Sequence, residues 1–164
     1  MTDRKNYNYM EIYDAAQNDD PEAIFQIATL YERESIEPVN GEDFPFWLKR
    51  FFKTNIINSI LVELGERDDG DASDSPSHDW NPEYYNYYPM IIDAGIMLGL
   101  YYMDSNILEE VELAAECFYN AWITSKFDFI EVSSEGYKTD LLSLLSQTAE
   151  HIEMIKGKES TNEQ

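Results

Sequence analysis

The sequence lacks the features that place a protein in a membrane or in an oxidising compartment. Among its 164 residues Cys117 is the only cysteine, so no disulfide can form within the chain, as is typical of a reducing compartment. Cys117 lies on an apolar helical pattern, which predicts a buried thiol. The longest apolar run, residues 89–103, is interrupted by Asp93 and falls short of the ~18 residues that a membrane span needs. Since residues 1–6 also lead into no apolar signal core, we expect a cytoplasmic protein without membrane contact.

Signals for catalysis are also scarce. The chain has only two histidines, His78 and His151, and it contains no zinc-protease, nucleophile-elbow, phosphate-loop or dinucleotide-binding motif. The pair His78-Asp79 has the chemistry to orient an imidazole for base catalysis, but in a serine-rich loop such a pair is usually just solvated. We therefore expect no enzyme and no cofactor. A small metal-dependent helical hydrolase that uses Asp and Glu is kept as an alternative.

One stretch has part of the spacing of a calcium-binding loop. Asp69, Asp71 and Ser73 match its positions one, three and five. Position six, which requires glycine, is Asp74, and position twelve, which requires a bidentate glutamate, is Trp80. Because both departures remove essential features, the sequence predicts no dedicated metal site.

Positive charge is the scarcest property of the chain. There are 11 Lys and Arg against 33 Asp and Glu, which gives a formal net charge of −22. Such a charge repels nucleic acid and anionic membranes and attracts basic proteins, although it also serves solubility alone. The one basic cluster, Lys49, Arg50 and Lys53, is too small for nucleic-acid binding, and we expect it to pair with nearby carboxylates.

Most of the chain carries apolar residues at helical spacing. Proline after a capping residue marks helix starts at Asp20-Pro21 and near Asp43, and Pro89 opens the most apolar segment. Ser105 or Asn106 is expected to cap the helix that follows. Repeat spacing favours a break at Thr54-Asn55. Only residues 127–132 have the character of an extended segment, so the predicted fold is all-α: antiparallel helix pairs in a short repeat array or a compact helical bundle. We expect a single domain over 1–156 and a flexible tail over 157–164.

Three segments resemble a Sel1-like repeat, a relative of the tetratricopeptide repeat. Residues 20–32 are similar to its first helix, and Leu98-Gly99 with Tyr102 looks like a second copy. Residues 112–122 look like the second helix of that copy, where paired small residues let helices approach closely. A middle copy keeps Leu64-Gly65 but has Asp68 at the tyrosine position. The starts at 27, 64 and 98 lie 37 and 34 residues apart, as in a helix-pair repeat. The resemblance, over residues 20–126, implies a protein-binding scaffold without chemistry.

The candidate site is the acidic loop predicted over residues 66–83 with the tyrosines that follow it. Carboxylates there can meet Lys and Arg of a partner, and aromatic rings can anchor it. The alternative is that Tyr84–Tyr88 forms the first turns of a packed helix. The candidate partner-binding residues are Asp68, Asp69, Asp71, Asp74, Asp79, Trp80, Glu83, Tyr84, Tyr85 and Tyr88.

These features predict a non-enzymatic acidic module that captures a basic protein. The most concrete version is an immunity protein, an inhibitor that neutralises a nuclease-type toxin by covering its basic active-site groove. The alternative is a DNA mimic, which blocks DNA-binding proteins with carboxylates spaced like phosphates. That alternative needs acid along helix faces, and Glu109, Glu110, Glu112 and Glu116 supply candidates.

Overall fold

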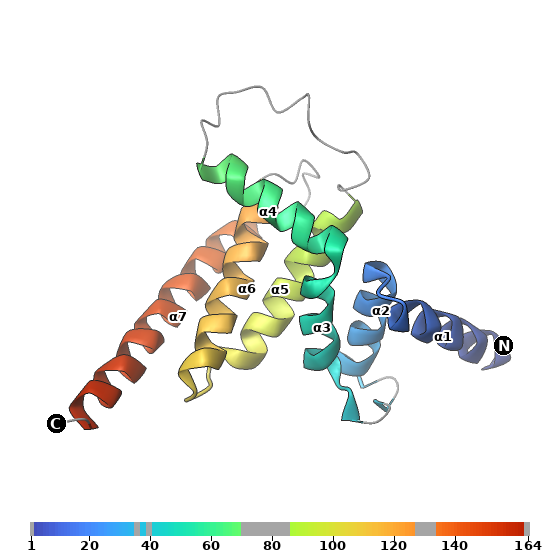
Figure 1. Cartoon of the computed structure of the whole chain (residues 1–164), viewed down its shortest axis with the longest axis horizontal. Helices are drawn as coiled ribbons and strands as arrows, with labels where there is room; N and C mark the ends of the chain where they lie inside the picture. The colour runs from blue at the N-terminus through green and yellow to red at the C-terminus, as the bar shows by residue number, and fades with distance from the viewer. Residues whose placement is uncertain (1, 35–36, 39–40, 70–85, 127–133, 163–164) are drawn as a thin grey trace. The chain divides into compact units, whose positions relative to one another are not determined.

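The computed structural model describes residues 2–34, 37–38, 41–69, 86–126 and 134–162. Within these ranges all regular structure is helical, which confirms the predicted all-α class (Figure 1). The helices are α1 (Thr2–Gln17), α2 (Pro21–Glu32), α3 (Phe44–Lys53), α4 (Asn55–Asp69), α5 (Tyr88–Tyr102), α6 (Leu108–Lys126) and α7 (Ser134–Asn162). The stretch 127–132, which we considered as an extended segment, lies outside the described residues.

The helices group into two compact units, Met1–Glu63 and Leu64–Gln164. The single domain over 1–156 and the flexible tail over 157–164 stay predictions. Helix α7 continues through residue 157 to Asn162. Ile155 is still buried, with 8% of its surface exposed, and the lysines at 156 and 158 are good helix formers.

In the first unit, α2 packs against both α1 and α3. Its start follows the prediction: Asp20 is the N-cap residue and Pro21 opens the helix, although the Asp20 side chain makes no capping hydrogen bond. Asp43 occupies the same position before α3, again without a side-chain bond. The hydroxyls of Tyr9 and Tyr31 lie 2.8 Å apart and join α1 to α2. The buried apolar residues of this unit include Ala16, Ala23, Ile24, Ile27, Ala28, Tyr31, Trp47, Leu48, Phe51, Ile57 and Ile60.

The predicted break after α3 is confirmed at Thr54. Its backbone is extended, with φ −64° and ψ 148°, so the helix cannot continue through it. Its hydroxyl Oγ1 donates a hydrogen bond of 2.8 Å to the carbonyl of Phe51, which satisfies one of the last carbonyls of α3. Helix α4 then begins at Asn55.

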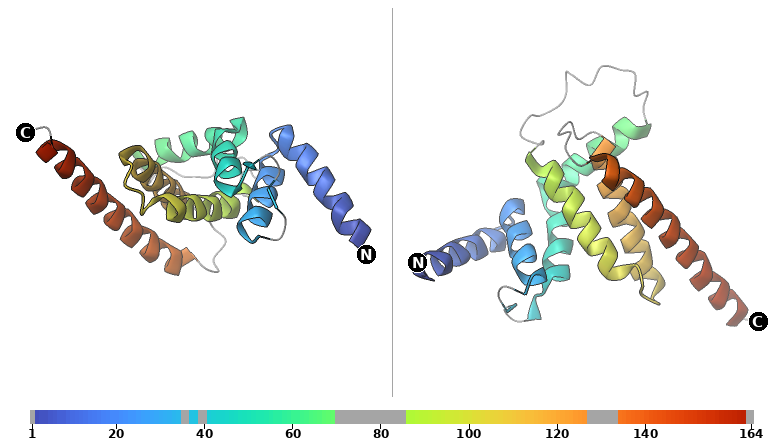
Figure 2. Two further views of the ribbon diagram at one scale, coloured as in Figure 1. Left: turned by 90° about the horizontal axis from the view of Figure 1, so that it is seen from below. Right: turned by 180° about the vertical axis from the view of Figure 1, so that it is seen from behind.

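In the second unit, α6 packs against both α5 and α7 (Figure 2). Two glycines of α5 set the distance between α5 and α6. A Cβ atom at Gly95 would lie 2.6 Å from the carbonyl oxygen of Cys117 and 3.1 Å from the Cβ of Ala121, and one at Gly99 would overlap the ring of Phe118. At this glycine seam the backbone and side chains of α6 thus come close to α5. The paired small residues expected within 112–122 stay a prediction from the family resemblance. The thiol of Cys117 is buried, as expected, with 1% of the residue exposed.

Helix α7 is held by one buried stripe and one polar bond. Leu141, Thr148 and Ile155 are buried at a spacing of seven residues, which places them on one face of the helix. His151 Nε2 lies 2.7 Å from the carbonyl oxygen of Ser105, in the connection between α5 and α6. This contact ties α7 to that connection.

The glycine seam makes a sharp stability prediction. Gly95→Ala should lower the free energy of unfolding by about 1–3 kcal/mol, because its Cβ meets backbone that must move. The matched control is Gly157→Ala in α7, where a Cβ would meet nothing within 4 Å; it should raise stability by about 0.5–1 kcal/mol, since alanine loses less entropy in a helix. Urea unfolding measures both. If both variants changed the free energy of unfolding in the same direction, the close packing proposed at Gly95 would be contradicted.

Candidate functional site

The structure describes only part of the predicted acidic loop. Asp68 and Asp69 form the end of α4, so this helix continues past residue 66, where the sequence predicted the loop to begin. The remaining candidates lie outside the described residues: Asp71, Asp74, Asp79, Trp80, Glu83, Tyr84 and Tyr85. Ser73 and His78 lie outside them as well.

Tyr88 is the candidate whose surroundings the structure describes. It is the first residue of α5, and only 1% of its surface is exposed. Tyr88 therefore belongs to the first turn of a packed helix, and its part in partner binding stays a prediction.

Arg50, a member of the basic cluster, makes its contacts within the first unit. Arg50 Nε donates a hydrogen bond of 2.8 Å to Asp19 Oδ1, and Arg50 Nη2 donates one of 2.8 Å to the carbonyl of Gln17. The guanidinium also lies over the ring of Trp47, 5.1 Å from its centre. Arg50 thus joins α3 to the turn after α1, where Asp19 has a positive φ of 67°. Pairing with nearby acid is confirmed for Arg50.

An acidic row follows one face of α6. Glu109, Glu112 and Glu116 are exposed, and their spacing of three and four residues aligns them on one side of the helix. Tyr119 continues the row and is 40% exposed. We call Glu109, Glu112, Glu116 and Tyr119 the α6 acidic row.

Glu110 has a different role from the acidic row. The hydroxyl of Ser105 donates a hydrogen bond of 2.6 Å to Glu110 Oε1 and accepts one of 3.0 Å from the backbone N–H of Ile107. The predicted capping residue Ser105 therefore organises the start of α6, two residues ahead of the position where a cap normally stands. Glu110 is fixed by this bond and lies half-buried.

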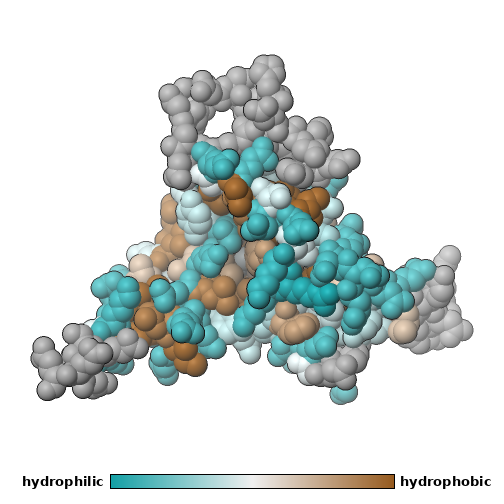
Figure 3. Space-filling model, in the orientation of Figure 1, coloured by the Kyte–Doolittle hydropathy of each residue, from teal (hydrophilic) through white to brown (hydrophobic). Residues whose placement is uncertain are grey.

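A second surface, which sequence reasoning missed, lies on α5. Leu100 and Tyr101 are 49% and 51% exposed, Met97 is half-exposed, and Asp93 and Asp104 are exposed. We call these five residues the α5 outer face. Figure 3, which draws the side of the molecule seen in Figure 1, shows hydrophobic side chains among hydrophilic ones. The signal was present in the sequence, because an apolar helix with no polar side must either be covered all round or expose apolar surface.

The exposed side chain of Asp93 is still partly covered by its surroundings on α5. This partial burial raises the pKa of its carboxyl above the ordinary aspartate value, because burial disfavours the charged form. At neutral pH the carboxylate therefore lacks part of its hydration. A cation brought to this carboxylate would compensate for that loss.

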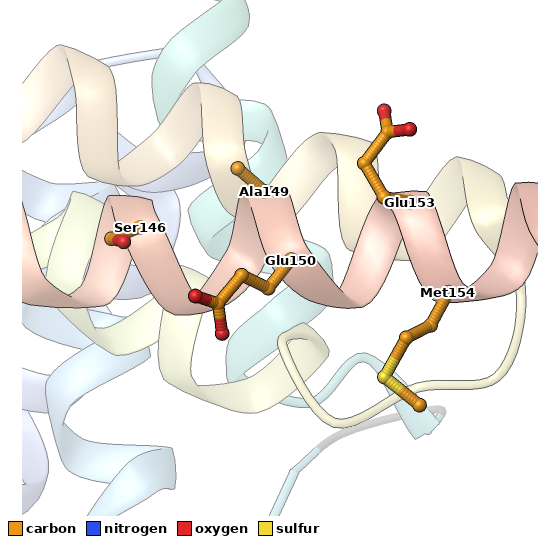
Figure 4. Close-up of a pocket in the computed structure, with 5 residues that line it drawn as sticks. All are labelled: Ser146, Ala149, Glu150, Glu153 and Met154. Carbon is orange, nitrogen blue, oxygen red and sulfur yellow. The ribbon is translucent and has the colours of Figure 1, made fainter.

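Helix α7 carries a shallow groove with two carboxylates. Figure 4 shows that its lining residues, Ser146, Ala149, Glu150, Glu153 and Met154, all belong to α7. Glu150 and Glu153 point in different directions from the helix (Figure 4). Their carboxylates therefore do not form a shared cation site. Among the residues that the structure describes, no group of three or more His, Cys, Asp or Glu is placed to hold a metal ion.

No family model, curated protein or solved structure matches this chain. None of the helices in the described ranges is long and apolar enough to cross a membrane. The site is therefore assigned from its own geometry.

Asp93→Asn should raise the free energy of unfolding at neutral pH. An acid with a raised pKa holds its proton longer in the folded state, so its contribution to stability falls as pH rises from the unfolded pKa to the folded pKa. The variant should lack this fall. Urea unfolding from pH 3 to pH 7 measures it, with Asp104→Asn as the control that removes an exposed carboxylate nearby. Equal pH profiles for Asp93→Asn and the parent chain would contradict the desolvation.

Proposed function

We propose that this protein is a non-enzymatic acidic module that captures a basic protein partner, most specifically an immunity protein that neutralises a nuclease-type toxin. The observation that carries the proposal is the charge of the α5–α6 pair. Residues 88–125 contain no Lys or Arg, and the basic residue of the pair is Lys126 at the end of α6. Their acidic residues are Asp93, Asp104, Glu109, Glu110, Glu112 and Glu116.

A negatively charged surface on rigid helices is suited to capture a positively charged protein. Complementary potentials speed encounter and reject wrong partners, and the glycine seam fixes α5 against α6, so little order has to be gained on binding. A nuclease must present a basic groove to bind the phosphates of its substrate. Carboxylates held in a row are a direct competitor for such a groove.

The residues predicted for the acidic loop remain part of this proposal. Asp71, Asp74, Asp79 and Glu83 add negative charge, and Trp80, Tyr84 and Tyr85 add aromatic surface. Asp68 and Asp69 connect this stretch to the end of α4. The resemblance to Sel1-like repeats supports the same kind of function, because such repeats act as protein-binding scaffolds.

DNA mimicry is the second candidate, and the α6 acidic row favours it. Its carboxylates recur at each helical turn along one line, a regular spacing that a DNA-binding protein could accept in place of phosphates. The two candidates differ in selectivity. An immunity protein holds one partner, whereas a DNA mimic binds several unrelated DNA-binding proteins.

The test is capture from a lysate of the native host at low salt, elution with a salt gradient, and assay of the eluted partner for nuclease activity. We expect one basic protein that is retained at high salt, and we expect its cleavage of DNA to stop when the acidic protein is added in equal amount. Several DNA-binding proteins that elute together would favour mimicry. The absence of any basic protein in the high-salt fractions would contradict both candidates.

Charge on the α6 acidic row should control the association rate. The triple variant Glu109→Gln, Glu112→Gln, Glu116→Gln should slow association with the captured partner about tenfold at low salt, because steering by charge is lost, and should flatten its salt dependence. The control Asp140→Asn, Glu150→Gln, Glu153→Gln removes the same charge from exposed positions on α7. Stopped-flow fluorescence measures both. Equal slowing by the two variants would mean that only net charge matters.

A further inference from the structure

The α5 outer face exposes more apolar surface than a solvated helix needs. Buried residues, among them Ile91, Ala94, Leu98 and Tyr102, cover one side of α5. The opposite side is also apolar at Met97, Leu100 and Tyr101, and its two polar members are both aspartates. The right-hand view of Figure 2 shows α5 in front of α6. From residue 93 to residue 101 the face runs along about two helical turns, or ~12 Å.

The spacing of this face matches what an amphipathic helix recognises. Met97, Leu100 and Tyr101 follow Asp93 by four, seven and eight residues, which puts them in line on one side of α5. Ile107, in the connection that follows, is 57% exposed. Apolar side chains at the centre of such a line, with carboxylates at its ends, can pack against the apolar stripe of a second helix that carries basic residues.

Charge decides which occupant fits. With no Lys or Arg from residue 88 to residue 125, a second copy of this chain would bring like charges together, and an anionic membrane would be repelled. A basic partner would gain favourable contacts with both the apolar residues and the aspartates of the face. The desolvation that raises the pKa of Asp93 would be offset by a partner's cation.

We propose that the α5 outer face is the docking site for a basic amphipathic helix of the protein partner. Apolar residues of that helix lie on Leu100 and Tyr101, and Lys or Arg side chains at its ends reach Asp93 and Asp104. This inference rests on the proposed capture of a basic protein, and it names the surface and the secondary structure through which capture occurs. The α6 acidic row lies on the side of α6 turned away from the seam, so it adds long-range attraction of a basic protein and does not line the docking site.

The probe is a fluorescein-labelled synthetic peptide of 18 residues, built only from Leu and Lys at helical spacing, and its binding is followed by fluorescence anisotropy. The double variant Leu100→Ser, Tyr101→Ser should weaken binding at least about tenfold, since it removes the apolar centre of the site. The control Leu142→Ser, Met154→Ser changes two α7 residues that are 53% and 57% exposed. It should change binding less than about twofold. Circular dichroism confirms that each variant is folded.

Two further measurements separate docking from simple attraction of charge. A peptide of the same composition, scrambled to destroy the helical period, should bind at least about tenfold more weakly. Asp93→Asn with Asp104→Asn should weaken binding more than Glu150→Gln with Glu153→Gln. The inference would be overturned if both peptides bound equally well or if the two variant pairs had equal effects. It would also be overturned if the protein bound vesicles of phosphatidylcholine and phosphatidylglycerol more strongly than it binds the helical peptide.

The peptide assay and the lysate capture fail independently. If the Leu100→Ser, Tyr101→Ser variant still retains the captured basic partner at full affinity, docking on α5 is wrong and capture of a basic protein stands. If the peptide distinguishes the variants as expected but no basic partner is captured, the docking surface is real and the proposed function fails.

Discussion

The close approach of α5 and α6 at Gly95 and Gly99 is the constraint on which the second unit depends. Without side chains at these two positions, the α6 backbone at Cys117 and the ring of Phe118 come directly against α5. Burial on this seam fixes which side of each helix remains outside. The seam thus sets the position of the acidic row on α6 and of the apolar residues on α5, and it links a local packing requirement to the surface that a partner would meet.

Much of the fold could be predicted because its signals are local. An aspartate at the cap position and a proline in the first turn mark the starts of α2 and α3, and Thr54 lies at the predicted break. Local signals do not report tertiary packing. The grouping of the helices into two compact units depends on contacts between residues far apart in the chain. The burial of Ile155 near the end of α7 and of Tyr88 at the start of α5 depends on packing as well.

The basic partner stays a prediction from charge composition. The acidic residues of α6 were named from the sequence, and the structure places Glu109, Glu112 and Glu116 on an exposed side of that helix. The α5 outer face was missed because the run from Pro89 to Met103 is apolar on every side, and a pattern without direction does not tell which side is buried. Only the position of α6 against Gly95 and Gly99 resolves this. In the proposed capture of a basic protein, exposed carboxylates would accelerate encounter and apolar contacts would resist dissociation.

The most direct test of this account is a backbone amide NMR titration of the 19.1 kDa chain with its captured basic partner. The account predicts that shifts and line broadening concentrate on residues 93–104 of α5 and its connection and on residues 109–119 of α6. Perturbation confined to α7 or to the first unit, with α5 and α6 unchanged, would contradict it.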